Sequence, residues 1–341
     1  MDDGVEQLLT GASIVLAAGS QSKTLPGFEI DGRTILGSDD VLTMTSLPES
    51  AAVIGGGAIG CEFASMLADL GTEVTILEAD ERLVPGADAD IAKALQRSFK
   101  KRGIKTLTGV TAVGHAPLVH ETTLQLSDGA EIEVQKIIVC IGRRPYTEHL
   151  QLAETSVEVD DQGFVRVDEF CRTNLDGIYA VGDLIATPQL AHVGFAEAML
   201  VVSDITGEPR APIDYSKVPW AIYCHPEIAY AGLSEEQAKA DGYEISVSQH
   251  RFIGNARALI HNDTEGMVKL VAERREDGKA GKLLGVHLIG PWATEQLGQG
   301  YLAINRDIEI SEIADFVQPH PTLSELFGEA ALELAGRTLH G

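Results

Sequence analysis

The residues with the clearest chemical potential lie near the C-terminus, in the stretch QPHPTLSE that ends at Glu325. His320 precedes the carboxylate of Glu325 by five residues. A carboxylate that holds one ring nitrogen of a histidine fixes the tautomer and leaves the other nitrogen able to accept a proton. The pair could therefore act as a general base. The same letters also fit a capping box with Thr322 as N-cap and Glu325 as N3 of a helix, so the octapeptide leaves both interpretations open.

A second candidate is the glycine-rich turn in AAVIGGGAIGCEFASMLADLGTEVTILEAD, which begins at residue 51. Gly55, Gly57 and Gly60 follow an apolar strand and open a helix, and Glu78 ends the next strand. In such a unit the first glycine permits the tight turn and the second lets the backbone approach a pyrophosphate. The third allows close helix packing, while the start of the helix offers N–H groups to the phosphates. The spacing predicts a dinucleotide site.

The acidic residue at the end of the second strand bears on the choice of dinucleotide. Glu78 is expected to accept hydrogen bonds from the adenosine ribose, and its charge repels a 2′-phosphate, which favours NAD over NADP. Arg82, four residues further on, keeps NADP open as an alternative. A strand-to-helix turn that binds nothing is the structural alternative for the whole motif.

Two further turns are weaker signals. AVGD exposes Asp183 after an apolar strand, and LAAGS places Gly19 after another. Open α/β sheets bind ligands at the carboxyl ends of their strands, so a second cofactor is conceivable there. An ordinary strand-ending turn explains each of them equally well.

Composition limits the classes of partner. The chain has 341 residues, 51 acidic against 26 basic, and a formal net charge of −25. Repulsion of phosphates argues against nucleic acid and against an anionic membrane as partners. No apolar run approaches the length of a membrane span. The four cysteines, Cys61, Cys140, Cys171 and Cys224, show neither zinc spacing nor a redox pair, so we predict no metal site and a cytoplasmic location.

Apolar runs and turn signals alternate along the chain as in an α/β protein. We expect a buried strand at 13–20, a βαβ unit at 51–80 and a helix at 89–103. A hairpin should turn at Asp128-Gly129. A helix is expected near 192–206, followed by a linker and a C-terminal α+β domain with two amphipathic helices.

These motifs resemble, in order and approximate spacing, those of the pyridine nucleotide disulfide oxidoreductases. The resemblance rests on the glycine turn with Glu78, IGRRP at 141–145, TNLDGIYAVGD at 173–183, LAH at 190–192 and HPTLSE at 320–325. It covers essentially the whole chain and is greatest to the dihydrolipoyl dehydrogenase group. It implies a flavoprotein that oxidises dihydrolipoamide with NAD, through FAD and a redox disulfide, as a homodimer serving a lipoyl-bearing protein of a 2-oxo acid dehydrogenase complex.

The resemblance also assigns residues. It implies a catalytic dyad in which His320 is the thiol base and Glu325 its partner, with the base contributed across the dimer interface. The remaining implied contacts are with cofactors: NAD at Gly55, Gly57, Ile59, Gly60, Glu78 and Gly142, and FAD at Gly19, Asp183, Leu190, Ala191 and His192, with Glu62 close to the flavin.

The resemblance predicts a Rossmann-like NAD domain inserted in the remainder of an FAD domain and followed by an α+β dimerisation domain. The expected boundaries are 1–44 and 161–206 for the FAD portions, 45–160 for the NAD domain and 207–341 for the dimerisation domain. Family members carry a flavin-binding Gly-x-Gly-x-x-Gly and a redox-active Cys-x-x-x-x-Cys in an upstream segment, and these 341 residues contain neither. The chain therefore resembles a C-terminal portion of such an enzyme. A non-catalytic NAD-binding or dimerisation fragment and another NAD(P)-linked disulfide reductase, such as glutathione reductase, are the alternatives.

Overall fold

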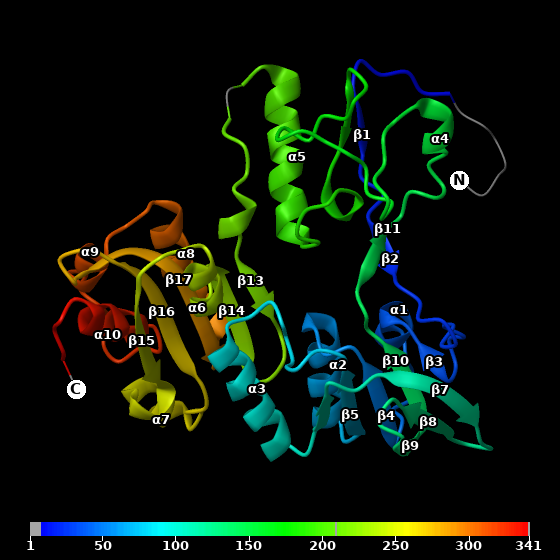
Figure 1. Ribbon diagram of the computed structural model, residues 1–341, viewed down its shortest axis with the longest axis horizontal. Coiled ribbons are helices and arrows are strands. Elements are labelled where there is room, and N and C mark those ends of the chain that lie inside the picture. The colour runs from blue at the N-terminus through cyan, green and yellow to red at the C-terminus, as the bar shows by residue number, and fades with distance from the viewer. Residues whose placement is uncertain (1–7, 209, 340–341) are drawn as a thin grey trace. The chain divides into compact units, whose positions relative to one another are not determined.

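The computed structural model describes residues 8–208 and 210–339 (Figure 1). The described chain forms two compact units. Unit 1 contains the chain up to Ser22 together with Arg143–Tyr215, and unit 2 contains Lys23–Gly142 and the chain from Ser216 onward. The division differs from the predicted domains: it falls at 22 rather than 44, and it groups most of the nucleotide region with the C-terminal region.

A parallel five-stranded sheet forms the first half of unit 2, in the order β3-β10-β4-β5-β6. Its strands are β3 (Ile35–Leu36), β4 (Ser50–Ile54), β5 (Glu73–Glu78), β6 (Lys105–Thr108) and β10 (Lys136–Val139). The helices of this half are α1 (Ser38–Leu42), α2 (Ala58–Asp69) and α3 (Ala89–Lys101). Because β3 pairs with β10, Ile35 and Leu36 belong to this sheet, although the predicted first FAD portion extends to residue 44.

The predicted βαβ unit is confirmed as β4, α2 and β5, and the predicted helix at 89–103 as α3. The predicted hairpin is also confirmed. It joins β8 (Thr122–Leu126) to β9 (Glu131–Val134), and β7 (Ala112–Pro117) completes that small antiparallel sheet. Gly129 has a positive φ of 86°, which the turn requires and which glycine adopts without strain.

The second half of unit 2 is an antiparallel five-stranded sheet in the order β13-β14-β17-β16-β15. The strands are β13 (Trp220–Ile222), β14 (Glu227–Gly232), β15 (Ile245–Arg251), β16 (Met267–Arg274) and β17 (Ala280–Gly290). Within the described part of this half the helices are α6 (Glu235–Ala240), α7 (Ala256–His261), α8 (Ala293–Asn305), α9 (Ile310–Ala314) and α10 (Glu325–Leu334). The prediction of two helices was wrong because α6, α7 and α9 are too short to show a helical period.

The two halves of unit 2 share one core. Ile222, Ile228 and Met267 from the antiparallel sheet are buried in the same cluster as residues of β4, α2 and α3. A buried lysine reinforces the junction. Lys269 of β16 is 1% exposed, and its Nζ lies 2.9 Å from Asp88 Oδ1 at the start of α3. It also lies 2.8 Å from carboxylate oxygens of Asp90 and Glu235. We call these four residues the Lys269 cluster.

Unit 1 has smaller sheets. β1 (Ile14–Leu16) pairs in parallel with β12 (Ile178–Ala180), and β2 (Ser20–Ser22) pairs antiparallel with β11 (Arg143–Pro145). Its helices are α4 (Leu152–Thr155) and α5 (Ala191–Thr206), so the helix expected near 192–206 is confirmed. The expectation of a buried strand at 13–20 was wrong. β1 is three residues long and its Ile14 and Val15 are exposed, since β12 is the one described strand beside it.

Among the described residues, no helix has the length and apolar character needed to cross a membrane.

Candidate functional site

The glycine turn between β4 and α2 has a backbone that excludes side chains at two positions. A Cβ on Gly60 would lie 1.9 Å from the carbonyl oxygen of Gly55, and one on Gly55 would lie 2.3 Å from that of Cys140. Gly55 also has a φ of 107°. Gly57, the N-cap of α2, has open space where a Cβ would stand. The turn is therefore closely packed inside and open at the start of the helix.

Glu78, at the end of β5, is bound to this turn by its carboxylate. Its Oε2 accepts a hydrogen bond of 2.6 Å from the Gly56 N–H, and its Oε1 accepts one of 2.8 Å from the Asp80 N–H. Glu78 is 9% exposed. A carboxylate oxygen can accept more than one hydrogen bond, so acceptor capacity remains for a ribose hydroxyl.

Arg82 lies in the same region but is engaged elsewhere. Its guanidinium forms two hydrogen bonds, of 3.0 and 2.8 Å, with the carboxylate of Glu236 at the start of α6. The side chain that kept NADP open as an alternative is thus paired within unit 2, which weakens that alternative.

The other predicted NAD contacts lie at the same edge of the sheet. Because β4, β5 and β10 are parallel, the residues that follow them meet there, and Gly142 follows β10. Its φ is 101°, and its carbonyl accepts a hydrogen bond from the Lys23 N–H. Ile59 is in the first turn of α2 and packs partly against the core. The open space at Gly57 and the unpaired N–H groups of a helix start fit a pyrophosphate, so the residues present fit NAD.

Glu62, also on α2, is turned toward the antiparallel half of unit 2. Its Oε1 accepts a hydrogen bond of 2.8 Å from the Tyr223 N–H. Burial raises the pKa of Glu62 above its usual value, while this hydrogen bond opposes the rise. The predicted proximity of Glu62 to a flavin remains a prediction.

In unit 1 the structure brings Gly19 and Asp183 together through a residue that the sequence analysis did not identify. Ser20 donates a hydrogen bond of 2.5 Å from its Oγ to Asp183 Oδ2. Arg143 donates to both Ser20 Oγ and the Ser20 carbonyl, at 2.6 and 2.8 Å. Asp183 follows β12 in a short 3₁₀ turn, and Gly19 precedes β2. No local pattern indicates this contact, because 163 residues separate Ser20 from Asp183.

Leu190, Ala191 and His192 form the start of α5, with Leu190 as N-cap. This start adjoins the Asp183 turn: Gln189 Nε2 donates to the Asp183 carbonyl at 3.5 Å. Glu197 of α5, which the sequence analysis also missed, is fully buried and accepts from the Gly182 N–H at 2.6 Å. Asp183 therefore lies beside the start of α5, and Gly182 has open space where a Cβ would stand. These features fit part of a flavin dinucleotide.

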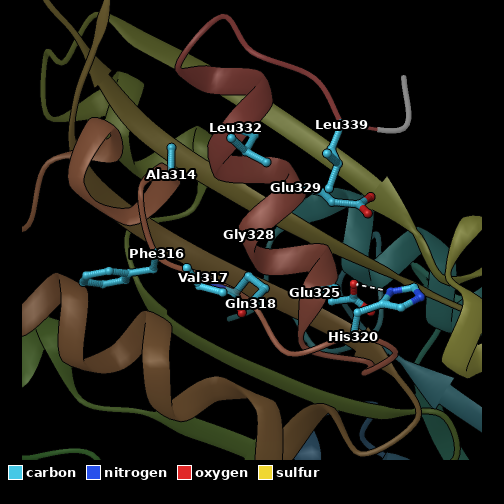
Figure 2. Close-up of a pocket in the computed structure, with 10 residues that line it drawn as sticks. All are labelled: Ala314, Phe316, Val317, Gln318, His320, Glu325, Gly328, Glu329, Leu332 and Leu339. Carbon is cyan, nitrogen blue, oxygen red and sulfur yellow. Dashed lines mark hydrogen bonds and ion pairs between the residues drawn. The ribbon is translucent and has the colours of Figure 1, made fainter.

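His320 and Glu325 lie together, facing one another in Figure 2. His320 Nδ1 is 2.8 Å from Glu325 Oε1. The imidazole is 63% exposed, whereas the carboxylate is 10% exposed. With Nδ1–H donating to the carboxylate, Nε2 is the ring atom able to accept a proton.

The second carboxylate oxygen of Glu325 makes one of the two hydrogen bonds expected of the capping box. Oε2 accepts a hydrogen bond of 2.8 Å from the Thr322 N–H. The reciprocal half of the box is missing, since Thr322 Oγ1 donates to the Pro319 carbonyl instead and the N-cap of α10 is Ser324. The predicted capping box with Thr322 as N-cap is therefore not formed, and Glu325 uses one oxygen for the Thr322 N–H and the other for His320.

A pocket of about 410 Å³ adjoins the pair. Figure 2 shows the residues that line it, which come from the end of α9 and the segment after it, from α10 and from the C-terminal segment. Apolar side chains such as Phe316, Val317 and Leu332 form much of its wall. The described protomer thus places its histidine–carboxylate pair at the side of an apolar hollow.

The four cysteines are free, and their surroundings make them poor nucleophiles. Burial raises the pKa of Cys140, Cys171 and Cys224 to about 12, and it also raises the pKa of Cys61 well above its usual value. A thiol with a raised pKa is protonated at neutral pH, so none of them is suited to disulfide exchange.

Comparison with known proteins gives two family matches. Residues 1–198 match the family described as pyridine nucleotide-disulphide oxidoreductase, and residues 218–331 match its dimerisation domain. A dihydrolipoyl dehydrogenase of Bacillus subtilis is 38% identical over 344 residues, which covers 98% of this chain and 70% of that protein.

The chain is also similar to proteins of known structure. LpdA of Mycobacterium tuberculosis superposes with a TM-score of 0.87 at 27% identity, covering 94% of this chain and 69% of that one. The HOCl-induced flavoprotein disulfide reductase RclA of Escherichia coli has a TM-score of 0.87 at 26% identity, covering 95% and 74%.

Proposed function

Since the chain belongs to the pyridine nucleotide-disulfide oxidoreductases, an enzyme family that uses FAD and NAD, we propose that it serves the oxidation of dihydrolipoamide with NAD as acceptor. The reaction converts the dithiol and NAD⁺ into the cyclic disulfide lipoamide, NADH and a proton. The observation that carries the proposal is the 2.8 Å contact between His320 Nδ1 and Glu325 Oε1. It leaves Nε2 of an exposed imidazole as the acceptor for a thiol proton.

The proposed role of His320 is to make the substrate a nucleophile. A thiol attacks a disulfide only as its thiolate, so a base that removes the proton at the site of attack accelerates exchange. Glu325 holds the ring in one tautomer and stabilises the imidazolium that forms. Bound FAD and NAD supply the electron transfer. In the proposal Asp183 and the start of α5 bind the flavin, while Glu78 and the glycine turn bind the nicotinamide nucleotide.

Glu78 supports NAD as the acceptor, since its buried carboxylate would repel a 2′-phosphate and Arg82 is paired with Glu236. The dimerisation domain supports a homodimer. A lipoyl-bearing protein of a 2-oxo acid dehydrogenase complex is the partner we propose, and a cytoplasmic location remains a prediction.

The reaction needs a redox-active disulfide that the four free cysteines do not provide. The test therefore uses the 341 residues preceded by a segment that carries the flavin-binding turn and redox cysteine pair of a dihydrolipoyl dehydrogenase. Dihydrolipoamide-dependent formation of NADH is followed by absorbance. His320→Gln should lower kcat by about 10²-fold, the contribution typical of a general base, with unchanged circular dichroism.

Two results would contradict the proposal. If His320→Gln matched its parent in rate and differed only in thermal stability, the pair would be a structural element. If the unsubstituted extended chain reduced glutathione disulfide with NADPH and did not oxidise dihydrolipoamide, the chain would be another kind of disulfide reductase. For the 341 residues alone we expect no turnover and little bound flavin, and a non-catalytic NAD-binding module would behave in the same way, so the extended chain makes the distinction.

A further inference from the structure

The negative charge of the chain is not evenly distributed. Residues 91–120 contain no aspartate or glutamate, although the chain has 51 acidic residues. The same segment contains six of the 26 basic residues: Lys93, Arg97, Lys100, Lys101, Arg102 and Lys105. It includes most of α3 and the whole of β6. A basic region therefore stands out on a strongly acidic molecule.

Part of this region forms a groove of about 860 Å³ between α3 and β6. Its α3 side presents Lys93, Arg97 and Lys100, which are exposed and recur at intervals of four and three residues. Such intervals place side chains on one face of a helix. The β6 side consists of residues 103–107. We call this the α3–β6 groove.

Of the six basic residues in this segment, the two outside the groove are paired with carboxylates, whereas two inside it are not. Lys101 pairs with Glu265, and Arg102 pairs with Asp69. Arg97 and Lys100 make no ion pair with any residue that the structure describes. Lys93 has a distant one, 3.9 Å from Asp90, and Lys105 pairs with Glu73 on the neighbouring strand. The groove thus holds positive charge that the described chain leaves uncompensated.

The floor of the groove is the edge of a sheet. β6 pairs with β5 on one side, and among the described residues no strand pairs with its other side. The outward N–H and C=O groups of an edge strand can pair with another strand. β6 carries no proline or glycine between Lys105 and Thr108 that would prevent such pairing.

We propose that the α3–β6 groove binds an extended acidic segment of a partner protein. The segment adds to β6 as a sixth strand, and its alternate side chains, about 6.6 Å apart, face α3. The basic residues of α3 recur about every 4.5–6 Å along the helix axis, so carboxylates at every second position would lie near them. A nucleic acid fits less well, because the net charge of −25 repels a long polyanion. It also has no peptide backbone that could pair with the edge strand.

The test uses a fluorescein-labelled peptide of alternating valine and glutamate with blocked ends, titrated with the full chain and followed by anisotropy. We expect saturable binding that weakens as salt rises. Arg97→Glu/Lys100→Glu should weaken binding by about tenfold or more, since two attractions become repulsions. Lys279→Glu/Lys282→Glu, on exposed residues at β17, is the matched control. It makes the same change in net charge and should have a much smaller effect.

Strand addition is tested separately from charge. The same peptide with every second amide N-methylated keeps its carboxylates but loses backbone donors, and it should bind at least about tenfold more weakly. NADH titration of each variant confirms that unit 2 is folded.

Three results would overturn the proposal. They are equal losses in the two charge-reversal variants, equal binding of the N-methylated peptide, or tighter binding of single-stranded DNA than of the acidic peptide.

Discussion

Two buried glutamates, Glu78 and Glu325, sit at the two parts of unit 2 to which we assign chemistry, and they use their oxygens differently. Both oxygens of Glu78 accept from backbone N–H groups, those of Gly56 and Asp80. Glu325 divides its oxygens between the Thr322 backbone and the His320 ring. The first carboxylate shapes a backbone that would itself hold a ligand, whereas the second positions a side chain that would react.

The difference predicts different consequences of substitution. At the glycine turn, binding and stability should fall together, because the binding groups are the backbone itself. At the pair, a substitution that keeps the Thr322 hydrogen bond should affect turnover and spare stability. Variants of the two regions can therefore distinguish residues that maintain the structure of a site from residues that take part in its reaction.

The largest effect is expected at the glycine turn. In Gly60→Ala the new Cβ would meet the Gly55 carbonyl at 1.9 Å, and a backbone atom cannot move aside as the end of a side chain can. We expect a loss of about 3 kcal/mol or more in the free energy of unfolding, with weakened NADH binding. Urea denaturation and fluorescence titration measure the two. Gly57→Ala, where the Cβ meets nothing, is the control, and an equally destabilised control would show that packing is not the cause.

The next effect is expected at Glu325, in the extended chain that carries the redox cysteines. Glu325→Gln retains an oxygen for the Thr322 N–H but presents an amide donor to His320 Nδ1, which favours the tautomer with the proton on Nε2. Turnover should fall at least about tenfold while the melting temperature changes little. Glu325→Ala should lower both the turnover and the melting temperature, because it removes the Thr322 hydrogen bond as well as the contact with His320. If the two variants differed from the parent only in melting temperature, Glu325 would be a cap and nothing more.

A smaller effect is expected at Glu78. Glu78→Gln replaces one of two acceptors by a donor that faces a backbone N–H, which costs about 1–3 kcal/mol in a buried place. Removal of the charge should also reduce the preference for NADH over NADPH. Paired titrations with the two nucleotides measure that preference. A variant that still discriminated like the parent would show that the ribose role belongs to another residue.

The smallest effect is a pH dependence at Glu62. Burial raises the pKa of this carboxyl in the folded chain, so near and above its ordinary value the folded state binds more protons than the unfolded state. Its contribution to stability is then present at low pH and is lost as pH rises through the folded pKa. Glu62→Gln keeps an acceptor for Tyr223 and should be slightly more stable than the parent at pH 7 and equal to it at pH 4. The reverse order at pH 7 would contradict the assignment.

The local features of the chain were predictable and the long-range ones were not. The turn at Gly55–Gly60 and the hairpin at Gly129 depend on backbone conformations that few residues adopt, so the letters themselves predict them. Ser20 and Glu197 act through partners on other segments, and no periodic pattern marks them. The pairing of β3 with β10 was not predictable either, because β3 is two residues long and its partner lies about a hundred residues later. The roles of His320 and Glu325 came from family resemblance, since the octapeptide also fitted a cap.

The Lys269 cluster affects which fragments of this protein can fold on their own. A nucleotide-binding piece cut at about residues 45 and 155 would keep Asp88 and Asp90 but lose Lys269, and it would expose core residues that pack against Ile222, Ile228 and Met267. Such a piece would lose the ion pairs of Lys269 and would expose apolar surface that is buried in the whole chain, so it should be less stable than the intact unit. The two halves of unit 2 should accordingly melt in a single calorimetric transition, and neither half is an autonomous folding module that could be exchanged between relatives without its counterpart.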